Sequence, residues 1–86
     1  MSGEADWVHV VFRSSGGAAA AQRALDGVCP AIVMPVLRQV SAACGVALRL
    51  VPGDLDRARD ALGKAGIPAE FYAVTGTGTT LACRKL

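Results

Sequence analysis

The most constraining feature of this sequence is its alternation of short strand-like runs with two helix-like segments. The clearer helix lies within residues 52–68, where apolar residues recur at helical spacing and Gly66 and Pro68 end the pattern. Its apolar stripe consists of Leu55, Ala58, Ala61, Leu62 and Ala65. A shorter helix is indicated by the alanine-rich residues 18–27, which follow cap-type serines and close on Asp-Gly.

Period-two alternation and β-rich composition predict four strands. These strands are residues 6–12, 31–35, 46–51 and 70–74. In the first strand, Val8, Val10 and Phe12 share one face, and Trp7, His9 and Val11 share the other. In the third strand, Val46, Leu48 and Leu50 share one face. Residues 81–86 fit either a short edge strand or a mobile end.

The resulting order, β-α-β-β-α-β, predicts an α+β, ferredoxin-like fold, in which a four-stranded antiparallel sheet carries two helices on one face. A chain of 86 residues suffices for one domain. We expect this domain to span residues 6–75, between a flexible N-terminus, residues 1–5, and a Gly/Thr-rich C-terminal tail, residues 76–86. The uncovered face of the sheet would carry Trp7, His9, Arg49 and Tyr72.

Composition and charge exclude several classes of function. Hydrophobic residues make up 52% of the chain and charged residues 19%, which is typical of a globular protein. The net charge is +2 with the basic residues dispersed, so we expect no nucleic-acid partner. No apolar run reaches the roughly 20 residues that span a bilayer, and the acidic start is unlike a signal peptide. We therefore expect no membrane association and a cytoplasmic location.

The cysteines bear on chemistry more than on stability. Cys29, Cys44 and Cys83 cannot all pair, and they form neither a CxxC motif nor a Cys/His cluster with zinc spacing. We therefore expect neither a disulfide scaffold nor a metal, and no cofactor. In a reducing compartment all three are free thiols, which makes their reactivity the open question.

The predicted topology places Cys44 near the start of the first helix. The second strand runs parallel to the first, so its link to the third strand lies at the end of the sheet where the first strand finishes. Cys44 is at the end of that link, immediately before Gly45. The same end holds residues 13–17 and the unpaired N–H groups of the helix start, which are natural partners of an anion.

These surroundings favour a thiolate at Cys44. Arg13 and Arg38 would add positive charge, and Gly45 would leave room for a sulfur or selenium adduct. A helical turn within residues 37–43 would act in the opposite direction, because its carboxyl end is negative. The alternative is that Cys44 is a small buried residue at the start of a strand.

The other two cysteines have weaker claims. Cys29 precedes Pro30, as in the CPxP motif of small sulfur-transfer proteins, but that motif leads into a helix and this one leads into a strand. Cys83 could serve as a resolving thiol, but incidental placement is the better explanation, and Cys83 is not among the expected site residues.

Other polar residues have ordinary structural explanations. His9 has no carboxylate or serine constellation around it and is predicted to be a surface histidine. Asp54, Asp56 and Asp60 suit the first turns of a helix. Residues 76–80 lack the lysine and following helix of a phosphate loop and are predicted to be a spacer.

Residues 35–50 contain a proline, a basic residue and a serine, then Cys-Gly and an apolar strand with a basic residue. This pattern resembles a family of small bacterial domains called putative selenium/sulfur carrier protein-like. The matching positions are Pro35, Arg38, Ser41, Cys44, Gly45 and Arg49. The resemblance extends over roughly residues 6–74, through Phe12 with Ser14 or Ser15 and through Pro52, Asp54 and Leu55. It departs at Leu37, where the family has a second proline, and at Ala43, where it has a serine.

The resemblance implies a carrier rather than a turnover enzyme. Cys44 would accept sulfur or selenium from a cysteine desulfurase or a selenocysteine lyase-type donor and pass it to an acceptor protein. Supporting residues would be Gly45, Ser41, Arg38, Ser14, Ser15, Gly16 and Gly17. The alternative is a non-catalytic interaction or homodimerisation module that uses the sheet face around Trp7 and Tyr72.

Two further classes of function are disfavoured. A metallochaperone would need a chelating CxxC loop, which is missing. An enzyme acting on small molecules would need a paired acid and base, and no such pair is evident.

Overall fold

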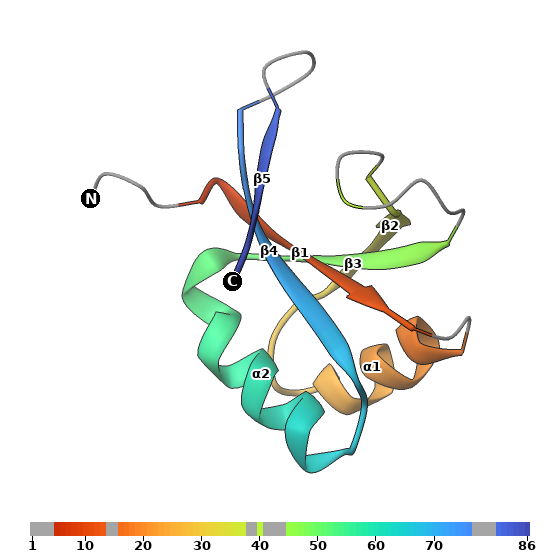
Figure 1. Ribbon diagram of the computed structural model, residues 1–86. Helices are drawn as coiled ribbons and strands as arrows, with labels where there is room; N and C mark the ends of the chain where they lie inside the picture. The colour runs from red at the N-terminus through yellow and green to blue at the C-terminus, as the bar shows by residue number, and fades with distance from the viewer. Residues whose placement is uncertain (1–4, 14–15, 38–39, 41–44, 77–80) are drawn as a thin grey trace.

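A five-stranded antiparallel sheet with two helices on one face forms the fold (Figure 1). The computed structural model describes residues 5–13, 16–37, 40, 45–76 and 81–86. The elements are β1 (Trp7–Phe12), α1 (Gly17–Leu25), β2 (Ile32–Pro35), β3 (Val46–Leu50), the 3-10 turn η1 (Pro52–Asp54), α2 (Leu55–Lys64), β4 (Ala69–Thr75) and β5 (Ala82–Lys85). The strand order is β2-β3-β1-β4-β5, and every neighbouring pair is antiparallel.

The prediction of four strands is wrong, because β5 adds a fifth. This strand lies along the edge of β4, with Ala82 opposite Thr75 and Lys85 opposite Tyr72. Gly76 has a φ of +84°, which suits the chain reversal after β4. Part of the segment predicted to be a tail thus pairs with the backbone groups of β4 that would otherwise form an open edge.

The core fills the space between the sheet and the two helices. Val8 and Val10 of β1 lie against Leu48 and Leu50 of β3, so the predicted inward face of both strands is confirmed there. The remaining buried members are Ala21, Leu25, Ala58, Leu62 and Phe71. Val46 is different: 47% of its surface is exposed, because it lies beyond the part of β3 that pairs with β1.

The start of α1 differs from the predicted serine cap. Gly16 occupies the N-cap position, and no side chain caps the helix. Ser14 and Ser15 lie outside the described residues. Along the rest of α1, Ala18, Ala21 and Leu25 are buried, as expected for an amphipathic helix on a sheet.

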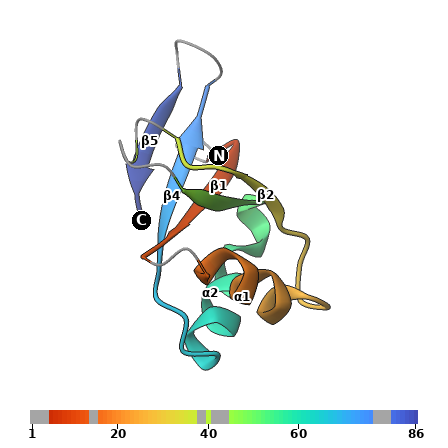
Figure 2. The same ribbon diagram turned by 90° about the vertical axis from the view of Figure 1, so that its right-hand side faces the viewer.

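His9 lies on the sheet face opposite the helices, where the chain that follows β2 covers it. The prediction of a surface histidine is wrong: the exposed fraction of His9 is 0%. The reason is the chain that leaves β2, because the backbone N–H of Leu37 donates to His9 Nε2 at 3.2 Å. Figure 2 shows this chain on the side of the sheet away from α1 and α2.

Candidate functional site

Three of the predicted site residues lie at the same end of the sheet. Because β1 and β3 are antiparallel, β3 starts at the end of the sheet where β1 finishes. Gly45 directly precedes β3, and its carbonyl accepts the N–H of Val36 at 3.2 Å. Gly16 and Gly17 follow β1 and begin α1 at this same end of the sheet. The start of α1 and the residue that precedes β3, Gly45, are thus at one end of the sheet.

The other predicted site residues lie outside the described part of the chain. They are Ser14, Ser15, Arg38, Ser41 and Cys44. Their roles stay predictions, as does the arrangement of their side chains around the thiol.

The start of α1 has features that suit an anion. Gly16 has helical backbone angles, and the Gly16 carbonyl accepts the N–H of Ala20 at 3.1 Å. The first turn contains no acidic residue, so no carboxylate of that turn offsets the positive end of the helix dipole. Among the described residues, a Cβ added at Gly16 would meet no atom within 4 Å.

The connection between β2 and β3, residues 36–45, is hydrogen-bonded at its beginning. Val36 is bound to Gly45, and Leu37 donates to His9. The N–H of Val40 then donates to the Leu37 carbonyl at 3.0 Å. Val36 and Leu37 are thus held at the point where the chain leaves β2.

Residues 8–73 match the model of a known protein family, described as "Putative Se/S carrier protein-like". The chain belongs to this family. The match runs from β1 into β4, so β5 lies outside it. Among curated proteins and among solved structures, nothing matches the chain.

Cys29 and Cys44 both lie within the range shared with the Se/S carrier-like family, and Cys83 lies outside it. Cys29 follows α1, is half-buried and packs against the core. Burial raises the pKa of the Cys29 thiol, and the Asp54 carboxylate raises it further against the opposing effect of Arg57. The thiol form of Cys29 is therefore favoured over the reactive thiolate.

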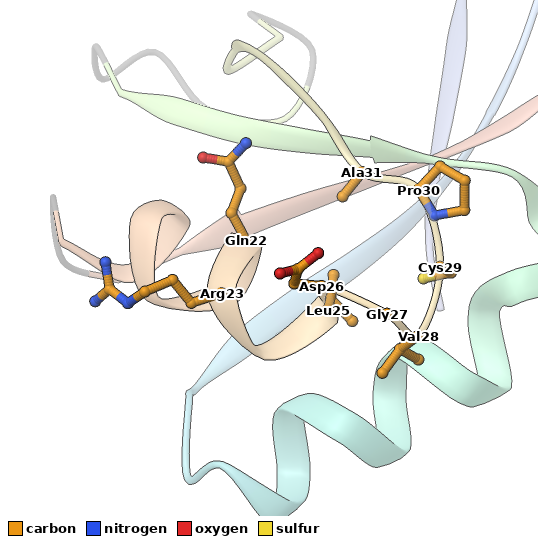
Figure 3. A pocket seen from close by; sticks show the side chains of 9 residues that line it. All are labelled: Gln22, Arg23, Leu25, Asp26, Gly27, Val28, Cys29, Pro30 and Ala31. Atoms are coloured by element: carbon orange, nitrogen blue, oxygen red, sulfur yellow. The ribbon is translucent and has the colours of Figure 1, made fainter.

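An open cavity lies beside Cys29, between the end of α1 and the chain that leads to β2 (Figure 3). Its lining includes Arg23, Asp26, Pro30 and Ala31. Arg23 points away from the thiol in this view. The lining residues therefore offer Cys29 no nearby cation that would stabilise a thiolate.

Cys83 lies at the opposite end of the sheet from Gly45. The pairings of β1, β4 and β5 align Cys83 with Val74 and Val74 with Trp7, the first residue of β1. Gly45 lies just beyond the other end of β1, so about 20 Å of strand separates its level from that of Cys83. Burial also raises the pKa of the Cys83 thiol. This geometry gives no support to Cys83 as a resolving thiol.

His9 is the feature that sequence reasoning missed. Its ring meets that of Trp7 edge to face, with centroids 5.6 Å apart, and Arg49 lies 4.9 Å from the centre of the Trp7 ring. Burial lowers the pKa of His9. One signal pointed towards it: the link after β2 is too long for a tight turn, and a longer link can pack part of its chain on the sheet.

Within the described ranges, no group of three or more His, Cys, Asp or Glu side chains is placed to hold a metal ion. No helix in the part of the chain that the structure describes is long and apolar enough to cross a membrane.

Proposed function

We propose that this protein carries sulfur or selenium on Cys44. The observation that supports this choice of residue is the state of Cys29. The family match contains two cysteines, and burial favours the neutral thiol of Cys29. Cys44 is the other cysteine in that range, and it directly precedes Gly45 at the edge where α1 begins.

The transfer needs only thiol chemistry. The Cys44 thiolate attacks the terminal sulfur of a persulfide on a donor protein. A new S–S bond forms at Cys44 while the S–S bond of the donor breaks, and the donor cysteine leaves as a thiolate. An acceptor thiolate then attacks the carried sulfur and returns Cys44 as a thiolate. With selenium, the carried atom forms a selenosulfide by the same exchange.

The charge on Cys44 would be stabilised from two sides. The start of α1, at Gly16 and Gly17, would supply backbone N–H groups and the positive end of the helix dipole. Arg38 with Ser41, and Ser14 with Ser15, would add charge and hydroxyl donors from the two neighbouring segments. Gly45 would leave space beside the adduct.

The partners follow from this chemistry. The donor would be a cysteine desulfurase or a selenocysteine lyase-type enzyme, and the acceptor would be a protein with its own thiolate. A free thiol carrier needs a reducing compartment, which supports a cytoplasmic location.

We also propose that the domain is ferredoxin-like. The strand order β2-β3-β1-β4, with α1 and α2 as crossovers on one face, supports this arrangement. β5 would then be an addition at one edge.

Incubation with a cysteine desulfurase and cysteine tests the carrier proposal. We expect the intact mass of the wild type to increase by one sulfur atom. The Cys44→Ala variant should gain no mass, whereas Cys29→Ala and Cys83→Ala should gain it as the wild type does. A wild type that gains mass from neither a sulfur nor a selenium donor would favour the alternative, a docking or dimerisation module.

A further inference from the structure

His9 binds the chain at the point where the β2–β3 connection leaves the sheet. Its Nε2 accepts the N–H of Leu37 at 3.2 Å, although the two residues are 28 positions apart. Val36, just before, is bound to Gly45, where the connection returns. The hydrogen bond to His9 thus joins β1 to Leu37, the first residue after the one that is bound to Gly45.

This hydrogen bond requires a neutral imidazole. An Nε2 that accepts must carry the ring's lone pair, so the proton of the neutral ring is on Nδ1. After protonation both ring nitrogens carry protons, and Nε2–H would face the N–H of Leu37. Two donors cannot share a hydrogen bond, so the charged ring and the bond to Leu37 exclude each other.

The surroundings of His9 do not compensate a positive ring. Among the described residues, Nδ1 has no hydrogen-bond partner. Across β3, Arg49 is the residue opposite His9, and across β4 it is Tyr72. The carboxylate on this face, Glu70, accepts the Tyr72 hydroxyl at 3.2 Å and lies 3.7 Å from Lys85 Nζ. The other residues that β2 and β5 place on this face are Ile32, Met34 and Cys83, and Leu37 contacts His9 from the connection.

We propose that neutral His9 is a positioning residue that holds the β2–β3 connection on the sheet, and that protonation of His9 releases the connection from β1. Burial lowers the pKa of His9, which keeps the ring neutral near neutral pH. The effect on transfer rests on the proposed function: Leu37 and Gly45 flank Cys44 in the sequence, so we expect the release of Leu37 to slow the transfer.

Amide hydrogen exchange at Leu37 tests the hydrogen bond directly. Protection factors, corrected for intrinsic exchange, are measured by NMR above and below the titration of the His9 ring, which its own signals report. We expect protection at Leu37 to fall at least about tenfold as His9 is protonated. Val36, bound to Gly45, serves as the local control, and Leu48 in the core reports global opening.

Two variants of His9 distinguish the effect of protonating the ring from the effect of its packing. In His9→Gln the side-chain carbonyl can accept the N–H without titrating, so protection at Leu37 should not depend on pH. In His9→Phe no acceptor remains, so protection should be low throughout. Leu37 protection that stays constant while His9 titrates would overturn the proposal. So would a His9 ring that stays neutral until Leu48 itself loses protection.

The consequence for transfer is read from a pH profile. The rate of persulfide transfer, divided by the thiolate fraction of Cys44, should fall at least about fivefold below the His9 titration in the wild type but not in His9→Gln. An equal fall in both proteins would contradict a positioning role. A wild type with no transfer at any pH would reject the proposed function, while Leu37 exchange would still decide the role of His9.

Discussion

A Cβ atom on Gly17 would lie 2.7 Å from the Cβ of Phe12. The first residue of α1 therefore packs directly against the last residue of β1. This contact sets where the positive end of α1 meets the sheet, at the edge where Gly45 precedes β3. A side chain at position 17 would push the helix start away from that edge.

Replacing Gly17 tests this packing. We expect Gly17→Ala to lower the free energy of unfolding by about 1–3 kcal/mol, because the clash is with the Cβ of Phe12 and not with a mobile side-chain end. Gly16→Ala is the matched control, since its Cβ would meet no atom of the described residues within 4 Å. It should cost about 0.5 kcal/mol or less. Urea unfolding measures both, and equal losses would contradict the contact.

Leu48 and Val46 share one face of β3 but differ in burial, so they test whether burial, rather than the alternating pattern, determines the contribution to stability. Leu48 has 0% of its surface exposed and Val46 has 47%, although both alternate onto the same face. Leu48→Ala should cost about 2–5 kcal/mol through the cavity it leaves in the core. Val46→Ala should cost less than about 1 kcal/mol. Thermal or urea unfolding of the two variants would show a similar loss only if the core extended beyond the part of β3 that pairs with β1.

His9 should make stability depend on pH. Because burial lowers its pKa, the unfolded chain binds the proton more readily than the folded protein. The contribution of His9 is therefore complete above its unfolded pKa of about 6.5 and is lost as pH falls toward the folded value. The free energy of unfolding of the wild type should fall faster with acid than that of His9→Gln, by at most about 1.4 kcal/mol per pH unit. Parallel curves from urea titrations at several pH values would show that His9 titrates alike in both states.

Cys29 should be a slow thiol. At neutral pH we expect iodoacetamide to alkylate Cys29 at least about threefold more slowly in the folded protein than in urea, because burial favours the thiol form. Burial is the largest cause of the raised pKa, so Asp54→Asn should restore only part of the difference. Mass mapping of tryptic peptides measures each rate. A folded Cys29 that reacts as fast as in urea would remove the support for choosing Cys44.

The periodic spacing of apolar residues predicted which side chains of several helices and strands face the core. The stripe of the second helix is an example, since Ala58 and Leu62 are buried. The predicted inward placement of Val8 and Val10 is likewise confirmed. Residues 81–86 were ambiguous, because a run this short shows no clear alternation, and the free edge of β4 decides its pairing.

The candidate site depended more on resemblance and long-range contacts. The family resemblance is confirmed by the match over residues 8–73. The choice of Cys44 came from that resemblance and stays a prediction. The burial of His9 could not be derived from its own strand, because Leu37 closes over it from a distant segment. The surroundings of Cys44 depend on the same connection and stay a prediction.

Trypsin offers the most direct measurement of the central claim, because it separates the three cysteines. Cys44 lies in the peptide of residues 39–49, Cys29 in residues 24–38 and Cys83 in residues 65–84. The protein is incubated with a cysteine desulfurase and cysteine, alkylated without reduction, digested and analysed by mass spectrometry. The carrier account predicts one extra sulfur on the peptide of residues 39–49 and none on the other two. An extra sulfur confined to Cys29 or Cys83, or absent from all three peptides, would contradict it.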